Sequence, residues 1–492
     1  MMAFLNNLFG PLLGSSAMAF ISKLNIDEGN LMSSIAIAMT AVSLCESYLA
    51  FRQRKVLAQE GEVPPELKND MDKEKFEKSR QYALDKNMFG LVQAQFDLII
   101  NISTLMLKMH VLLWISSELI LNKIGLPIDK YEINQTYVFV VLSSIVEVVL
   151  NTPFKLYSTF VIEEKHGFNN QTLGFFVKDE IKKFFLSQVI TFPILSGIIF
   201  IIKAGGPYFA FYAWGFTTVV ILVMMTIYPV YIAPLFDKYT SLPEGELRTE
   251  IEALAKKLDY PLTKLFVVEG SKRSAHSNAY LYGFFKNKRI VLFDTLIKGY
   301  KSADATEEDK KNGDDKDITA EEKKKLEEKQ NAKKDRGCTT EEIVAVLGHE
   351  LGHWKYSHMV KMLIITEVKI LLFFILFSKV LNSKSLYRAF GFSKSQPAVI
   401  GLTVILGNIL TPCKVVINLL MGCLSRHFEY QADYFATTLG YSKELGASLI
   451  KLHVDNLSFP FNDRWYSLYH FSHPTLIERL RTIAQYKTKK TD

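Results

Sequence analysis

Seven long apolar stretches constrain the fold of this chain more than any other feature. They cover about residues 31–51, 97–121, 137–160, 184–203, 208–236, 361–381 and 397–424. A helix of about 20 apolar residues crosses the ~30 Å hydrocarbon layer of a bilayer. Hydrophobic residues make up 49% of the 492 residues, and the mean hydropathy is +0.11, which is high for a soluble protein of this length. The sequence therefore predicts a mainly α-helical integral membrane protein with seven spans.

Charged residues interrupt five of the predicted spans, namely Glu46, Lys108, Glu147, Lys369 and Lys414. Charged side chains within spans usually face the protein interior or a water-filled cavity, so these residues favour a hydrated interior. The alternative is that side chains near span ends reach out to the membrane surface. That alternative accounts poorly for Glu147.

Lysine and arginine residues predict the orientation, because they gather in loops on the cytosolic side. They are frequent in 52–96, 164–183, 237–348 and after 425. With these segments in the cytosol, the N-terminus is lumenal and the C-terminus is cytosolic, although the basic segment 382–396 fits less well. The glycosylation sequon at Asn134 then falls in a lumenal loop. The N-terminus lacks the pattern of a cleaved signal peptide and is expected to be retained.

Charge, cysteines and the C-terminus narrow the class of protein. The net charge of +7 is modest for this length, so nucleic-acid binding is not indicated. The four cysteines are scattered without CxxC spacing, which argues against a disulfide framework and against a thiolate zinc site. The chain ends in Lys489-Lys490-Thr491-Asp492, which fits a dilysine signal for retrieval to the endoplasmic reticulum. An ordinary basic terminus is the alternative.

We divide the chain into four parts. Residues 1–236 hold the first five spans, 237–360 form a first cytosolic segment, 361–424 hold the last two spans, and 425–492 form a second cytosolic segment. The first cytosolic segment is expected to contain a helix at 246–259 and a small β-sheet that includes strands at 265–268 and 289–293. It also contains a charged insert at 301–336.

The insert at 301–336 has 11 Lys or Arg and 12 Asp or Glu residues and almost no apolar ones. It cannot bury a core, so we expect a solvated loop that is disordered or loosely helical.

A zinc-binding pattern, His349-Glu350-Leu351-Gly352-His353, stands between the soluble segment and the sixth span. Histidines four residues apart share one face of a helix and can bind one zinc ion, while the glutamate between them can act as general base. Residues 341–356 contain no proline and several apolar positions, and Thr339 or Thr340 can cap them. A helix is therefore predicted here.

The third zinc ligand is expected where the seventh span returns to the cytosolic side, because the sixth span leaves that side just after His353. Glu429 and Asp433 stand there, and residues four apart share a helix face. Glu429 would complete a His2Glu zinc site with one open position. Asp433 would accept a hydrogen bond from the second nitrogen of a ligand histidine.

Two alternatives to this ligand assignment remain. Glu429 and Asp433 could form a solvated face paired with Arg426. His427 could compete as a ligand, although it stands two residues from Glu429 and so points to another side of a helix.

Five segments, taken together, resemble the type I CAAX prenyl proteases, which are zinc endopeptidases of the endoplasmic reticulum and inner nuclear membranes. The segments are EEKHGFN (163–169), SNAYLYGFFKNKRIVLFDT (277–295), HELGHW (349–354), SRHFEYQAD (425–433) and HPTLIERL (473–480). The resemblance covers about residues 40–480. The N-terminal extension of about 30 residues and the charged insert depart from the family's pattern.

The resemblance implies seven long helices around a water-filled chamber, with a metalloprotease domain over its cytosolic end. It implies one zinc ion held by His349, His353 and Glu429. The substrates are CAAX proteins or peptides already prenylated on their cysteine, which lose their last three residues. In fungi the family matures a farnesylated mating pheromone, in some members with a second cut near its N-terminus.

The same resemblance assigns further site residues. Glu350 matches the base and Asp433 the acid behind the metal. His473 and Arg479 match residues that help bind substrate or the developing oxyanion, and Asn278 matches a position on an edge strand that pairs with the peptide. From the residues alone, His473 could equally be a structural residue in a turn.

The remaining histidines carry weaker expectations. His358 is interpreted as a support for the ligands or as a residue at the membrane interface. We expect His276, His453 and His470 to be ordinary polar residues.

Two other functions stay open at this point. The first is a membrane quality-control protease that cuts misfolded or stalled chains with the same chemistry. The second is a non-catalytic receptor or transporter for prenylated or lipid ligands in which the metal is only structural. The second predicts an incomplete site, whereas this sequence holds three ligands and a base.

Overall fold

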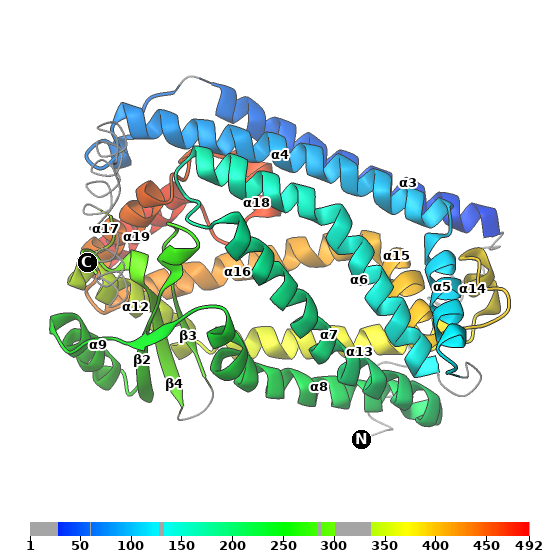
Figure 1. The fold of residues 1–492 in the computed structure, drawn as a ribbon. Coiled ribbons are helices and arrows are strands. Elements are labelled where there is room, and N and C mark those ends of the chain that lie inside the picture. The colour runs from blue at the N-terminus through cyan, green and yellow to red at the C-terminus, as the bar shows by residue number, and fades with distance from the viewer. Residues whose placement is uncertain (1–27, 60, 127–131, 284–286, 301–335, 492) are drawn as a thin grey trace, which may run out of the picture. The chain divides into compact units, whose positions relative to one another are not determined.

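A computed structural model describes residues 28–59, 61–126, 132–283, 287–300 and 336–491 (Figure 1). The N-terminal extension and residues 301–335 of the charged insert lie outside this part. The side chains of the C-terminal Lys489 and Lys490 also lie outside it. By its internal contacts the chain divides into two compact units. The first comprises Met1–Leu44, Phe96–Ser143 and Ile375–Cys413, and the second comprises Cys45–Gln95, Ser144–Phe374 and Lys414–Asp492.

The structure is mainly helical, as predicted, and several helices are long and apolar. In the described residues, five helices are able to cross a membrane by length and composition: Gly29–Ala58, Lys73–Met106, Glu132–Glu163, Leu173–Ala204 and Gly206–Leu235. A sixth is added if Ile400–Ile409 and Thr411–Thr438, which meet at 71°, form one broken span. These segments contain α3 (Glu28–Ala58), α4 (Lys73–Met106), α6 (Glu132–Tyr157), α7 (Leu173–Ala204), α8 (Phe209–Ile227), α15 (Leu406–Ile409) and α16 (Thr411–Thr438).

The apolar stretch predicted as a span at 97–121 is not a single helix, so its predicted boundaries were wrong. The chain breaks at Lys108, which has a positive φ of 51°, and α5 (Met109–Lys123) starts a new direction. A left-handed residue cannot continue an α-helix. The long helix is α4, which begins at Lys73, well before the apolar stretch.

The helix α13 (His358–Leu381) contains the stretch predicted as the sixth span. It carries Lys361, Glu367, Lys369 and Lys379 spread along its length, and it is not among the five helices above. Glu367 accepts a hydrogen bond from Thr218 of α8 at 2.6 Å, so part of this charge is paired within the protein.

A four-stranded sheet lies in the second unit. The strands β1 (Tyr239–Ser241), β2 (Leu262–Val268), β4 (Lys288–Phe293) and β3 (Ala279–Tyr282) lie in the order β1-β2-β4-β3. The pair β2·β4 is parallel and the other pairs are antiparallel. The two predicted strands and the predicted helix, α9 (Glu246–Lys257), are confirmed. The short strands β1 and β3 were missed.

Packing on this sheet decides which way the zinc-binding pattern faces. The helix α12 (Thr340–Lys355) buries Ile343, Leu347 and Leu351, one every four residues, against the core that includes Ile290 and Leu292 of β4. A position two residues further along a helix points about 200° away. The apolar stripe therefore turns the two histidines of the pattern away from the sheet.

The other helices of the second unit follow in the C-terminal part of the chain. They are α17 (Ser442–Asp455), α18 (Arg464–His470) and α19 (Leu476–Thr491). In Figure 1, α19 and one end of α16 lie close to α12, near the point marked C. In the first unit, α14 (Lys384–Ala389) places the buried Tyr387, which donates a hydrogen bond to the carbonyl of Pro397.

The start of α12 supplies a testable prediction. Thr339 accepts a hydrogen bond from the backbone N–H of Glu342, and Glu342 accepts one from the backbone N–H of Thr339, a reciprocal cap. Thr339→Ala should cost about 1 kcal/mol of stability and lower the unfolding temperature. The matched control is Thr340→Ala, which removes the same atoms without removing the cap. Equal unfolding temperatures for the two variants would contradict the prediction.

Candidate metal centre

One glycine of α12, Gly352, sets its distance from α16. A Cβ atom added to Gly352 would lie 3.0 Å from the Cα of Ala432 and 3.1 Å from the Cβ of Phe435. A Cβ atom added to Gly348 would meet its nearest neighbour, Tyr441, at 3.4 Å, which is an ordinary contact. The close approach at Gly352 brings the side chains of α16 within reach of the two histidines.

Three side chains from these two helices converge. The Nε2 atoms of His349 and His353 lie 3.1 Å apart. Glu429 Oε2 lies 3.4 Å from His349 Nε2, and Glu429 Oε1 lies 3.3 Å from His353 Nε2. One ligand atom from each of the three residues lies within 4.8 Å of the other two, a spacing that one zinc ion with bonds of about 2 Å can bridge. The three residues can therefore hold one metal ion.

The electrostatics of the group fit a cation. Burial alone would lower the pKa of His349, but its hydrogen bonds to Asp433 and Glu429 prevail and raise the pKa to about 9. The surroundings of His349 thus favour a positive charge, which a bound metal ion would supply. Two imidazoles and one carboxylate form the donor set of many catalytic zinc sites.

A buried ion pair supports the ligands from behind. His349 Nδ1 donates to Asp433 Oδ1 at 2.8 Å, which leaves the Nε2 lone pair for a metal. Arg479 of α19 binds both oxygens of Asp433, through Nη2 at 2.6 Å and Nε at 2.9 Å. Arg479 Nη1 also lies 3.6 Å from Glu429 Oε2. Asp433 is completely buried, so loss of either partner would leave a buried charge uncompensated, which typically costs about 3–5 kcal/mol.

His473 stands on the open side of the group. Its Nε2 lies 3.4 Å from Glu429 Oε1, and its side chain remains 62% exposed. Its Nδ1 contacts Ser472 Oγ at 2.8 Å. The structure therefore places His473 where it can reach both the ligands and an incoming molecule.

Glu350 is partly buried beside the ligands. Burial raises the pKa of its carboxyl group, although the nearby His349 and His353 oppose that shift. A raised pKa makes the carboxylate a stronger base than an exposed glutamate. The position and chemistry of Glu350 suit a proton acceptor.

Asn278 is not part of this group. In the described part of the chain it makes no hydrogen bond to the ligands, and its side-chain oxygen accepts one from the N–H of Ala279 at 2.8 Å. It stands directly before β3, whose outer edge pairs with no other strand of the described sheet. Because α12 and β3 share one core, a peptide added at this edge would run near α12.

Sequence reasoning missed the role of His276. Its ring stacks on Phe168 with centroids 4.1 Å apart. Its Nδ1 contacts Asn456 Oδ1 at 3.1 Å, and its Nε2 lies 3.4 Å from Glu163. Glu163 and Phe168 belong to the EEKHGFN segment, so this segment anchors the chain just before β3. No local pattern signals the contact, because the partners are more than 100 residues apart in sequence.

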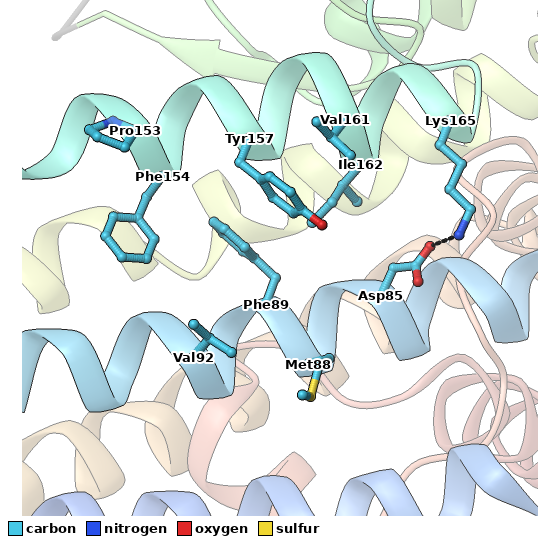
Figure 2. Close-up of a pocket in the computed structure, with 10 residues that line it drawn as sticks. All are labelled: Asp85, Met88, Phe89, Val92, Pro153, Phe154, Tyr157, Val161, Ile162 and Lys165. Atoms are coloured by element: carbon cyan, nitrogen blue, oxygen red, sulfur yellow. Dashed lines mark hydrogen bonds and ion pairs between the residues drawn. The ribbon is translucent and has the colours of Figure 1, made fainter.

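An apolar groove lies elsewhere in the second unit. Figure 2 shows it between α4 and the helical segment that runs from α6 into the π-helix η3 (Ser158–Glu163). Its volume is about 450 Å³, and the pair Asp85–Lys165 stands at one end with a 2.7 Å contact. None of the predicted site residues lines it, so the candidate metal centre does not rest on this groove.

Several known proteins are similar to this chain. Residues 53–238 match the family described as CAAX prenyl protease N-terminal, five membrane helices, and residues 241–487 match peptidase family M48. The CAAX prenyl protease 1 homolog of Homo sapiens is 47% identical over 94% of this chain and 96% of its own length. CAAX prenyl protease 1 of Saccharomyces cerevisiae is 36% identical over 90% and 93%.

A solved structure is also similar. The crystal structure of S. mikatae Ste24p matches with a TM-score of 0.79 and 35% identity, over 92% of this chain and 98% of that chain.

The glycine contact at the centre gives a prediction. Gly352→Ala should push α12 away from α16, because the added methyl group meets backbone atoms, and overpacking costs about 1–3 kcal/mol. We expect weaker zinc binding and a lower unfolding temperature. Gly348→Ala is the matched control and should keep zinc affinity, with a neutral or slightly higher stability because alanine favours helix. Equal zinc affinity in both variants would show that the contact does not set the ligand geometry.

Proposed function

The chain belongs to the type I CAAX prenyl proteases of peptidase family M48, and we propose that its candidate metal centre cleaves prenylated CAAX proteins directly after the modified cysteine. Membership makes the chain a multi-pass membrane metalloendopeptidase that processes CAAX proteins. The observation that carries the assignment to particular residues is the convergence of His349, His353 and Glu429 beside Glu350.

We assign the metal as one zinc ion per chain, held by His349, His353 and Glu429. When bound, zinc lowers the pKa of a water molecule and polarises the scissile carbonyl. Glu350 would accept a proton from the attacking water and pass it to the leaving amine. Asp433 holds His349 in the tautomer that presents Nε2, as its 2.8 Å hydrogen bond supports.

We assign different tasks to the two remaining residues. The exposed ring of His473 donates to the developing oxyanion, and loss of such a donor typically costs about 10²–10³ in rate. Arg479 donates to Asp433 from Nε and Nη2, and its Nη1 lies 3.6 Å from Glu429, which supports a role in holding the two carboxylates in place. The substrate backbone adds to the free edge near Asn278, where main-chain hydrogen bonds give affinity with little sequence demand.

The proposal extends to the membrane part. Seven spans surround a water-filled chamber, with α13 and the bent pair α15–α16 as the last two. The four parts 1–236, 237–360, 361–424 and 425–492 then alternate between membrane and cytosol. The N-terminus is lumenal, and the active site and C-terminus are cytosolic. The protein lies in the membrane of the endoplasmic reticulum, and the inner nuclear membrane is a second location. In fungi its substrates include farnesylated pheromone precursors, which receive a second cut near their N-terminus.

The test uses the full chain purified in detergent and a farnesylated peptide that ends in a CAAX sequence. Wild type should release the last three residues, as the product mass shows. Glu350→Gln should lower the rate by about 10²–10⁴ because the general base is lost, with zinc still bound. Glu341→Gln, an exposed glutamate on the same helix, is the matched control and should cleave at the wild-type rate.

Other outcomes decide against the proposal. Cleavage of unfolded proteins by a zinc-loaded enzyme that leaves the prenylated peptide intact would favour quality-control proteolysis. Full activity of Glu350→Gln would remove Glu350 from the mechanism and revive a site in which the metal is only structural.

A further inference from the structure

A second histidine stands behind the candidate ligand His353. His353 Nδ1 and His358 Nδ1 are 2.9 Å apart, and His358 Nε2 lies 2.8 Å from Gln431 Oε1. These contacts join α12, the first residue of α13 and the middle of α16. We propose that Gln431 and His358 form an uncharged relay that fixes the proton of His353 on Nδ1 and thereby sets the zinc affinity of the site. The inference rests on the proposed zinc site.

The direction of the relay follows from the amide oxygen. Gln431 Oε1 can only accept a hydrogen bond, so His358 Nε2 carries a proton and donates it. In a neutral imidazole the other nitrogen is then an acceptor. His358 Nδ1 therefore accepts from His353 Nδ1–H, and the lone pair of His353 is left on Nε2, which faces His349 and Glu429.

The reverse orientation of the amide does not fit a metal ligand. If the amide nitrogen of Gln431 donated to His358, each hydrogen bond of the relay would reverse. The proton of His353 would then sit on Nε2, only 3.1 Å from His349 Nε2 and pointing into the group. A protonated nitrogen cannot bind a cation, so only the first orientation serves the site.

Packing holds the middle of the relay in place. The His358 ring is 3% exposed and stacks on Phe428 of α16, with centroids 4.0 Å apart and planes 6° apart. Ser357, directly before it, has a positive φ of 55°, which ends α12 and lets α13 start in a new direction. In a continuous helix, positions five apart would lie about 140° apart around the axis. The break at Ser357 is therefore what turns His358 toward His353.

The two histidine ligands are thus supported by different chemistry. His349 donates to the Asp433 carboxylate, which is itself paired with Arg479. His353 donates to the neutral ring of His358, which is held in turn by the neutral amide of Gln431. Groups that orient metal-binding histidines typically change metal affinity by about 10- to 100-fold when they are removed. The relay is expected to act at this level without adding charge to the site.

The experiment measures zinc affinity of the detergent-purified full chain by competition with a chelator, without substrate. His358→Phe keeps a ring against Phe428 and removes the acceptor, and it should weaken zinc binding about 10- to 100-fold. Gln431→Met keeps a side chain of similar size without the oxygen and should weaken binding in the same direction. Gln431→Glu keeps an acceptor and should bind zinc at least as tightly as wild type.

A matched control and a second readout separate this role from packing. His427→Phe makes the same change at an exposed position of α16 that is not one of the three converging side chains, and it should leave zinc affinity unchanged. With zinc at saturation, His358→Phe and Gln431→Met should keep the wild-type KM for the farnesylated peptide, because the relay does not touch substrate. If Gln431 served only in packing, Gln431→Met and Gln431→Glu would change the unfolding temperature equally, and neither would change zinc affinity.

Two results would overturn the inference. One is wild-type zinc affinity in His358→Phe, and the other is equal weakening by Gln431→Glu and Gln431→Met. If His358→Phe does not fold, the two Gln431 variants decide. Wild-type protein that binds zinc but does not cleave the prenylated peptide would overturn the proposed substrate and leave the relay standing.

Discussion

The close contact between α12 and α16 is the constraint on which the rest of the site depends. Gly352 of α12 lies against the backbone of Ala432, and only this short separation lets a carboxylate of α16 reach two imidazoles of α12 at 3.3 and 3.4 Å. Bonds to zinc are about 2 Å long and tolerate little variation. A glycine in the middle of a helix costs about 1 kcal/mol relative to alanine, so the helix gives up intrinsic stability at the place where the metal centre needs room.

Around this contact the site balances charge in layers. The negative charges of Glu429 and the buried Asp433 are balanced in part by Arg479. A metal cation held by Glu429 would balance them from the other side. His473 stands toward the open side, where a substrate would arrive, and Glu350 is partly buried beside the ligands. Only one ligand histidine donates to a charged partner. The other leads to His358 and Gln431, which carry no net charge, so the site avoids adding a further buried carboxylate whose desolvation would have to be offset.

Much of the candidate site could be predicted from the sequence, because helical spacing translates directly into a shared face. The pair His349 and His353, and the pair Glu429 and Asp433, are both four residues apart, and the structure brings each pair to one side of its helix. The helix after residue 339 was also predicted correctly, and Thr339 is the one of the two expected residues that caps it. The break at Lys108 was not, because a positive φ at a lysine leaves no mark in the apolar pattern. The strands β1 and β3 were missed because three or four residues are too few for a recognisable alternation.

The sequence by itself determined the class of protein, the helical and apolar character of its spans, the identity of its family and the residue types of a metalloprotease site. These follow from composition, from periodicity and from motifs that are local in the chain. Only the tertiary structure decided how the segments meet. Packing set the separation of α12 and α16 at Gly352 and the double hydrogen bond of Arg479 to Asp433. It also anchored His276 to Glu163 and brought His358 to His353 across the turn at Ser357. Packing joins residues from different helices, and no spacing along one chain segment encodes a distance between two helices.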